Sequence, residues 1–179
     1  MSFRLAAVAL TAFAFASIVT AQEASDVKIH HSEAGGVSVR FLNIPWGPQT
    51  FSAMEHPGDG FYSDRTWPFT RLESKVAVSI GETDLPAGNY ALVFHPNKGQ
   101  GMVLEAVKIA AGEFLQEGNI MTKTPEGESV YKSPAIFELV DETLPALEVS
   151  LVADDDEIRL RVAYGNRRLQ RTLKRREVK

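Results

Sequence analysis

Regular alternation of apolar and polar residues is the feature that most constrains the fold of this chain. In EIRLRVAY (157–164) every second residue is Ile, Leu, Val or Tyr, and the residues between them are mostly charged. The same alternation occurs in VSVRFL (37–42), KVAVSI (75–80) and ALEVSLVA (146–153). A β-strand with one face buried and the other in water produces a period of two, whereas an amphipathic helix produces a period of 3.6.

Turn residues separate these stretches. Gly-Asn stands at the centre of YGNRR (164–168), and DDD (154–156) follows another alternating run. Both are typical of tight connections between antiparallel strands. GMVLEAVKIAAGEFL (101–115) fits a strand or a helix, and we favour the strand. Because no repeat or linker divides the chain, the sequence predicts an all-β, single-domain antiparallel β-sandwich or an open barrel.

Residues 1–21 have the composition of a secretory signal peptide. Arg4 precedes the apolar run LAAVALTAFAFASIV (5–19), and VTA (19–21) resembles a cleavage site. The run is shorter than the roughly 20 residues that a transmembrane helix needs. We therefore expect cleavage after Ala21, a folded domain over residues 22–179 without a transmembrane segment, and a periplasmic or secreted location.

Composition excludes several functions. The chain has no cysteine, which rules out disulfides and thiolate chemistry. It has 19 Lys and Arg against 23 Asp and Glu, a balance that argues against nucleic acid as a partner. The segment RRLQRTLKRREVK (167–179) is basic, however. It is either a half-buried edge strand with a solvated charged face or a contact for anionic lipid or polysaccharide.

The stretch LPAGNYALVFHP (85–96) predicts a hairpin turn followed by a central strand. We expect Gly88 to adopt a positive φ in that turn. Tyr90, Leu92 and Phe94 would then face one layer, and Ala91, Val93 and His95 the other. His95 would end the strand, since Pro96 cannot continue a hydrogen-bonded ladder.

Residues 44–70, IPWGPQTFSAMEHPGDGFYSDRTWPFT, do not resemble a strand. They include four prolines, three glycines and both tryptophans of the chain, Trp46 and Trp67. Long irregular segments in compact domains are often functional. The aromatic residues could plug one end of the sandwich, or they could line a pocket together with polar groups such as His56.

The pocket interpretation gives a specific hypothesis about binding residues. Its wall would be formed by Trp46, Trp67 and Glu73, its mouth by His56 and His95, and Arg71 would be a further polar group. We expect strand pairing to bring the Glu73 carboxylate next to the His95 ring. The alternative is a Glu–His pair that merely satisfies two polar side chains at the end of the sandwich.

No catalytic or metal-binding motif is recognisable. Glu55, His56 and Asp59, with His95, offer ligand atoms for a divalent ion, but no known metal spacing is present. We therefore predict no metal or cofactor. The favoured function is a binding module in the cell envelope for a small molecule, a glycan or an envelope protein. The alternatives are a metal-dependent or carboxylate-based hydrolase using residues 44–73, and a structural component that needs no pocket.

Three motifs resemble a known family. LPAGNYALVFHP is similar to its L-P-A-G-x-Y-x-L motif, Trp67 and Glu73 have the spacing of its W-R-x-G-A-N-E motif, and IRLRVAYG (158–165) is similar to its late strand. Over roughly residues 37–173 the chain resembles the exported bacterial proteins grouped as domain of unknown function 2911. The resemblance implies export and a β-sandwich, and it implies no established activity.

Overall fold

The computed structural model of the chain describes residues 26–56, 67–97, 101–112, 115–117 and 126–176, and for residues 50 and 67–69 it describes the backbone alone. The expected signal peptide lies outside these residues. The elements in chain order are β1 (Ile29–Ala34), β2 (Val37–Leu42), α2 (Pro48–Glu55), β3 (Trp67–Ser74), β4 (Val78–Ile80), β5 (Thr83–Leu85), β6 (Gly88–Asn97), β7 (Gly101–Ile109), β8 (Glu128–Pro134), β9 (Glu138–Leu139), β10 (Glu148–Asp154), β11 (Glu157–Tyr164) and β12 (Arg167–Arg175).

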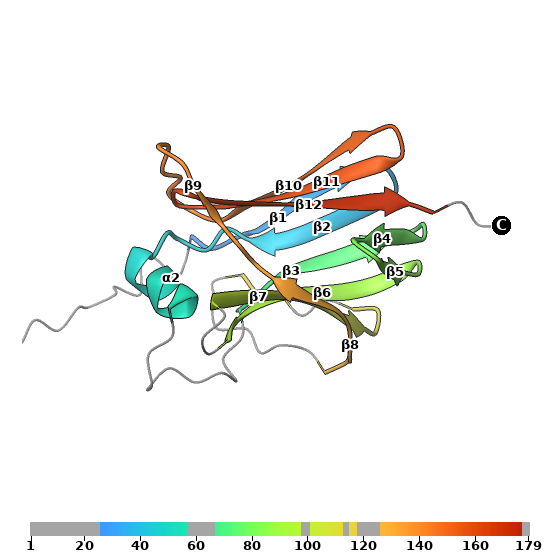
Figure 1. Ribbon diagram of the computed structural model, residues 1–179, viewed down its shortest axis with the longest axis horizontal. Coiled ribbons are helices and arrows are strands. Elements are labelled where there is room, and N and C mark those ends of the chain that lie inside the picture. Colours follow the sequence, from blue (N-terminus) through green and yellow to red (C-terminus); the bar gives the residue numbers. More distant parts are fainter. Residues whose placement is uncertain (1–25, 57–66, 98–100, 113–114, 118–125, 177–179) are drawn as a thin grey trace, which may run out of the picture.

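Two antiparallel sheets make up the molecule. The first has the strand order β1-β2-β3-β6-β7-β8, and the second has the order β10-β11-β12-β4-β5, with β9 paired to the start of β12. Figure 1 looks onto the faces of the sheets, whose strands overlap in this view, with α2 at one end. This arrangement confirms the all-β antiparallel sandwich predicted from the alternating residues. Among the described residues, no helix has the length and apolar character needed to cross a membrane.

The core lies between the sheets and is built from the predicted rows. On β11, Ile158, Leu160 and Val162 are at most 2% exposed, and burying each such side chain contributes roughly 1.5–3 kcal/mol. The outward residues of the same strand are partly or fully exposed. The tight turns also form where the sequence predicts them, because Asp155 and Gly165 both have positive φ.

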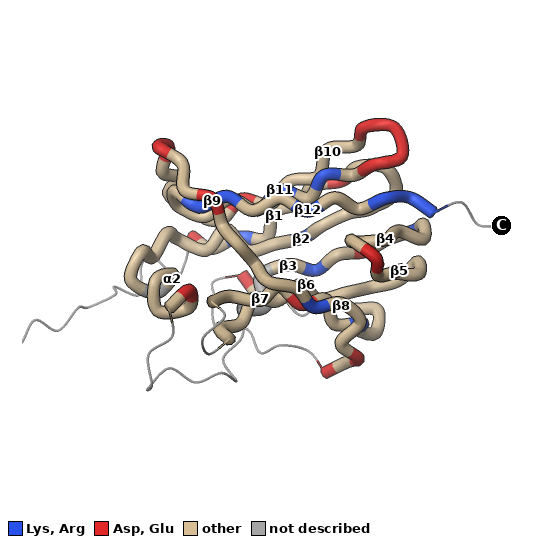
Figure 2. The backbone as a smooth tube through the Cα atoms, in the orientation of Figure 1, with Lys and Arg blue, Asp and Glu red and all other residues tan. Residues whose placement is uncertain are grey.

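Charged residues gather on the second sheet. Figure 2 shows acidic residues at the turn between β10 and β11 and basic residues at the C-terminal end of β12. β12 is not the edge strand that the basic segment suggested. It lies between β11 on one side and β9 and β4 on the other, with Leu169 and Leu173 in the core.

The prediction for LPAGNYALVFHP is confirmed in part. The strand does not end at His95, because β6 continues through Pro96 to Asn97, which pair with Met102 and Gly101 on β7. β6 is a central strand between β3 and β7, and its two rows face opposite sides: Tyr90, Leu92 and Phe94 join the main core, while Ala91 and Val93 belong to a small cluster on the outer face.

The predicted hairpin turn is wrong. Residues 86–87 connect β5 in the second sheet to β6 in the first, so the strands they join do not pair. Gly88 is the first residue of β6 and is not among the glycines with positive φ. The hydroxyl of Tyr90 donates a hydrogen bond to the carbonyl of Pro86 and closes the connection.

Residues 101–109 form strand β7, as favoured, but residues 48–55 form a helix that the sequence did not predict. Pro48 occupies its first turn, where the missing N–H costs nothing. Phe51 and Met54, three residues apart on one face, are buried against the end of the sandwich.

Candidate functional site

The structure separates the six residues proposed for a pocket into two groups. The backbone of Trp67 pairs with that of Phe94, next to His95 on β6, whereas Arg71 pairs with Ala91 and Glu73 with Asn89. Trp46, His56, Trp67 and His95 therefore belong to the end of the sandwich that carries α2. Arg71 and Glu73 lie farther along, towards the opposite end.

The expected contact between Glu73 and His95 is wrong. Asn89, the partner of Glu73, is six residues from His95 on β6, which corresponds to roughly 20 Å. When antiparallel strands follow each other, the end of the first meets the beginning of the second, and His95 is at the far end of β6. The carboxylate beside His95 belongs instead to Glu105 on β7, with 3.0 Å between Nε2 and Oε2.

The pair of His95 and Glu105 is nearly buried. Its side chains are 11% and 17% exposed, and the contact lacks the geometry of a hydrogen bond. Both residues lie on the outer face of the first sheet, in the same row of side chains as the small apolar cluster of Ala91, Val93 and Val107.

Trp46 is part of an aromatic plug at the end of the sandwich. Its ring packs edge-on against Tyr164 at 4.7 Å between centroids and lies 5.7 Å from Phe51. The hydroxyl of Tyr164 donates to the carbonyl of Pro45 at 2.7 Å and accepts from the N–H of Gly47 at 3.0 Å. The adjoining apolar cavity has a volume of about 10 Å³ and leaves no room for a ligand.

His56 and Arg71 each have polar partners within the fold. His56 lies 3.8 Å from the carboxylate of Glu55, which is also 3.2 Å from Arg167. Arg71 donates to Oδ1 of Asn89 at 2.7 Å. In the part of the chain that the structure describes, no three His, Asp or Glu side chains are placed to hold a metal ion. Asp59, which the sequence suggested as a ligand, lies outside that part.

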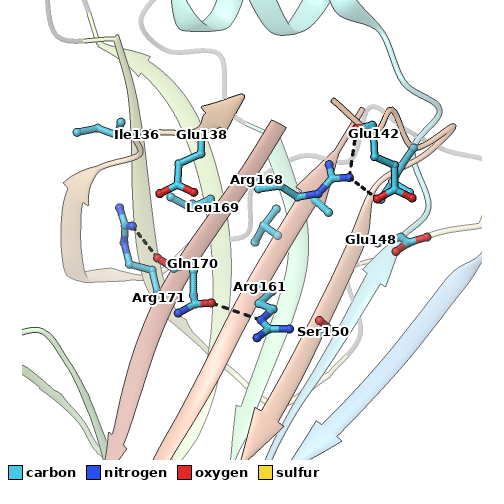
Figure 3. Close-up of a pocket in the computed structure, with 13 residues that line it drawn as sticks. Ile136, Glu138, Glu142, Glu148, Ser150, Arg161, Arg168, Leu169, Gln170 and Arg171 are labelled. Atoms are coloured by element: carbon cyan, nitrogen blue, oxygen red, sulfur yellow. Dashed lines mark hydrogen bonds and ion pairs between the residues drawn. The ribbon is translucent and has the colours of Figure 1, made fainter. Parts of the chain in front are cut away.

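A groove of about 530 Å³ lies on the outer face of the second sheet. None of the six residues proposed from the sequence is among its lining residues. Figure 3 shows it between the face of the sheet and the segment that leads from β8 through β9 to β10. Its lining residues are Ile136, Glu138, Glu142, Leu144, Glu148, Ser150, Arg161, Val162, Ala163, Arg168, Leu169, Gln170 and Arg171.

Strand register creates the floor of the groove. Residues directly opposite each other on neighbouring strands project from the same face of the sheet. One row crosses β9, β12, β11 and β10 and consists of Glu138, Arg168, Ala163 and Glu148. The next row crosses β12, β11 and β10 and consists of Gln170, Arg161 and Ser150.

Ala163 explains why the floor is hollow. It is the only small apolar residue in the two rows, and it stands between Arg168 and Glu148. Its neighbours on the same face have long side chains that rise around it. The hollow therefore has an apolar base and a polar rim, which is the composition of many small-molecule sites.

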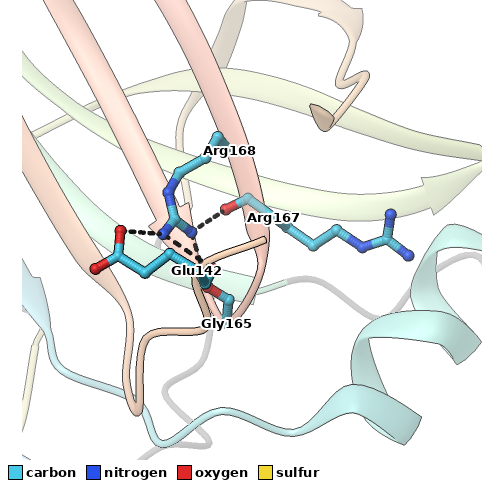
Figure 4. Close-up of polar contacts among 4 residues, drawn as sticks. All are labelled: Glu142, Gly165, Arg167 and Arg168. Carbon is cyan, nitrogen blue, oxygen red and sulfur yellow. Dashed lines mark hydrogen bonds and ion pairs between the residues drawn. The ribbon is translucent and has the colours of Figure 1, made fainter. Parts of the chain in front are cut away.

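Two arginines fix the wall of the groove in place. Arg171 donates to the carbonyl of Pro134 at 2.5 Å, where the connecting segment leaves β8. Arg168 donates to the carbonyl of Gly165 at 2.7 Å, and its guanidinium lies 3.6 Å from the carboxylate of Glu142 (Figure 4). These contacts link the wall of the groove to β12. Ile136, which forms its outer rim, is 77% exposed.

The remaining charges in the groove have few partners. Arg161 donates from Nε to Oε1 of Gln170 at 3.3 Å, and this is its one polar contact with the described residues. Glu138 and Glu148 make no ion pair with any described residue. The groove thus presents a cation and two carboxylates, and it contains no histidine that could act as a base towards Ser150.

Sequence reasoning missed the groove because its residues come from four separate strands and a connecting segment. Each of them alone resembles a solvated outer face, which is the usual environment of alternating charges. The one available signal is Ala163, a small residue among the charged outward positions of EIRLRVAY.

Comparison of the chain with protein-family models, with curated proteins and with solved structures finds no match. The class of protein is therefore defined by the fold and the groove alone: a β-sandwich with a polar, charged groove on one outer face.

Proposed function

We propose that the protein is an exported binding module whose ligand lies in the groove over Ala163. The observation that carries this proposal is the hollow itself, which is ringed by Arg161, Glu148 and Gln170, each of them on a paired strand of the second sheet. Sites built on strands position their polar groups more accurately than sites on loops. We thus keep the function expected from the sequence, a binding module, and we propose that its site lies on the second sheet instead of at residues 44–73.

The groove favours a small polar molecule over the other partners that the sequence left open. Its volume of about 530 Å³ lies within the roughly 300–1,000 Å³ of small-molecule sites. Its lining contains three Glu and three Arg, so their formal charges cancel. A polyanion such as nucleic acid would meet no net attraction in this groove.

Filling the hollow tests this function. The side chain of Ala163 faces the groove, so Ala163→Leu should occupy the hollow without entering the core. The control is Thr172→Leu, which adds a similar side chain on the same face outside the groove. Ligand-observed NMR against sugars, amino acids, dipeptides and small carboxylic acids provides the readout.

We expect molecules that bind the wild-type protein to bind Thr172→Leu equally and to lose at least tenfold in affinity for Ala163→Leu. Hits that bind Ala163→Leu as tightly as the wild type would show that the groove is not the site, and a screen without hits would count against a binding module of this kind.

Export is the second part of the proposal, and it rests on the apolar segment before VTA (19–21) and on the resemblance to an exported family. If residues 1–21 are removed, N-terminal sequencing of protein recovered from the envelope or the medium should begin at Gln22. A recovered protein that still contains Phe13 would contradict export by this route.

The buried pair of His95 and Glu105 favours a second candidate, a hydrolase site on the first sheet. A carboxylate next to a histidine is a common feature of sites with a general base. Hydrolysis of chromogenic esters or glycosides by the purified protein should then be lost in His95→Gln and retained in Ala163→Leu. Absence of hydrolysis by the wild-type protein would leave the binding module as the function.

A further inference from the structure

Arg161 and Glu148 in the groove carry opposite charges but form no ion pair with each other, and this property points to a class of ligand. We propose, on the basis of the binding function proposed above, that the ligand is a short zwitterionic peptide with free termini. Its carboxylate binds Arg161 and its ammonium group binds Glu148.

Arg161 has the features of a carboxylate-binding residue. It projects from β11 into the groove, and its hydrogen bond to Gln170 uses Nε alone. That bond orients the guanidinium, while both terminal nitrogens make no hydrogen bond or ion pair with the described residues. A guanidinium binds a carboxylate through two parallel hydrogen bonds, which an ammonium group cannot do.

Glu148 is placed to bind the other end of the ligand. Ser150 is directly opposite Arg161, and Glu148 is directly opposite Ala163, so Glu148 and Arg161 are diagonal neighbours across β10 and β11. Such positions are roughly 7–8 Å apart. Figure 3 shows the two side chains without a contact between them, and the hollow over Ala163 adjoins both.

A dipeptide has a length similar to the spacing of these two positions on the strands. Two extended residues span roughly 7 Å, so a dipeptide lying over Ala163 would have one terminus near each of the two side chains. A simple anion would be repelled by Glu148 and a simple cation by Arg161. A neutral sugar would cover both charges without neutralising either of them, which is costly when water is displaced.

Four free dipeptides, Ala-Ala, Leu-Ala, Lys-Ala and Glu-Ala, are the probes for calorimetric titration. N-acetyl-Ala-Ala lacks the ammonium charge, Ala-Ala amide lacks the carboxylate, and maltose represents a neutral saccharide. We expect at least one free dipeptide to bind. Blocking either terminus should weaken binding about tenfold or more, since each block removes a charged hydrogen-bonding partner.

The variants assign each terminus to its residue. Glu148→Gln should weaken binding of the free dipeptide about tenfold. It should not weaken binding of the N-acetylated form, which has no ammonium group for Glu148 to bind. Arg161→Gln should likewise weaken binding of the free dipeptide about tenfold, and it should not weaken binding of Ala-Ala amide, which has no carboxylate for Arg161 to bind. Arg159→Gln is the control, because Arg159 lies on the same strand and face but outside the groove, and it should leave every Kd unchanged.

The outcomes separate this inference from the binding function. Maltose or another neutral molecule that binds wild-type protein but not Ala163→Leu, without binding of any free dipeptide, would overturn the zwitterionic ligand and retain the groove as a site. Equal binding of free and N-acetylated dipeptide would also overturn it. Loss of binding in Glu148→Gln that is equal for both forms would show that Glu148 does not bind the ammonium group.

Discussion

Tyr164 shows how a single side chain closes one end of the sandwich. It ends the buried row of β11 and is 3% exposed. Its hydroxyl group bonds the backbone on both sides of Trp46, at Pro45 and Gly47. Burial raises the pKa of Tyr164 to about 12, and the hydrogen bond from Gly47 partly opposes that rise.

This shift predicts a change of stability in alkaline solution. The pKa is higher in the folded than in the unfolded protein, so the folded protein retains the proton between about pH 10 and pH 12. Stability due to this group is complete below pH 10 and is lost as the pH rises towards 12. The full loss should approach about 3 kcal/mol, since the shift is about two pKa units at 1.36 kcal/mol each.

The measurement is the free energy of unfolding in denaturant from pH 8 to pH 12 for the wild type and Tyr164→Phe. The difference between the two proteins should shrink as the pH rises. A difference that does not depend on pH would contradict an ionisable, buried Tyr164.

The burial of Tyr164 could be predicted from the sequence, because it belongs to the alternating row of EIRLRVAY. Its partners could not, since they lie on a segment 119 and 117 residues away in the chain. The same limit explains the error about His95. Its central strand was predictable, but the register that places Glu105 rather than Glu73 beside it was not.

At the scale of elements, the turn between β11 and β12 depends on Gly165 for two reasons. Its φ is +57°, which favours glycine, and a Cβ atom there would lie 2.1 Å from the ring of Trp46. Gly81, between β4 and β5, has nearly the same φ of +58° but no atom within 4 Å of the corresponding position. Substituting these two glycines therefore distinguishes the cost of a side chain at positive φ from the cost of its overlap with the ring of Trp46.

We expect Gly81→Ala to destabilise the protein by about 1 kcal/mol, the cost of a side chain at positive φ. Gly165→Ala should cost about 2–4 kcal/mol, because the ring of Trp46 must move as well. Thermal or denaturant unfolding of both variants measures the difference. Equal destabilisation would mean that Trp46 does not pack against the turn as described.

The elements that local patterns predict are those whose partners are nearest in sequence. β10, β11 and β12 follow one another through tight turns, and the alternating residues and the Gly-Asn turn predicted them. The sequence of the connection at 86–87 resembles a hairpin turn, yet the connection joins two sheets. Whether such a turn closes a hairpin depends on which strand β5 pairs with, and the turn residues do not indicate this. Helix α2 was missed because it is short and the buried residues described in it, Phe51 and Met54, are too few to show a helical period.

At the scale of the whole molecule, the candidate site is a product of sheet topology. Glu138 and Glu148 are ten residues apart on either side of a connecting segment, and Arg161 belongs to a third strand. Only the registers of β9, β12, β11 and β10 place them around Ala163. No spacing along the chain indicates this arrangement, so the fold class could be predicted from sequence and the groove could not.

One measurement tests the central claim that this groove binds the ligand. A ¹H–¹⁵N spectrum of the protein, titrated with the best hit of the ligand screen, identifies the amides that respond. We predict that the largest shifts belong to residues of the groove floor, Ser150, Arg161, Ala163 and Gln170, while the amide signals of Ala91, Val93 and Glu105 on the first sheet stay unchanged. Shifts confined to the first sheet around His95 would contradict it.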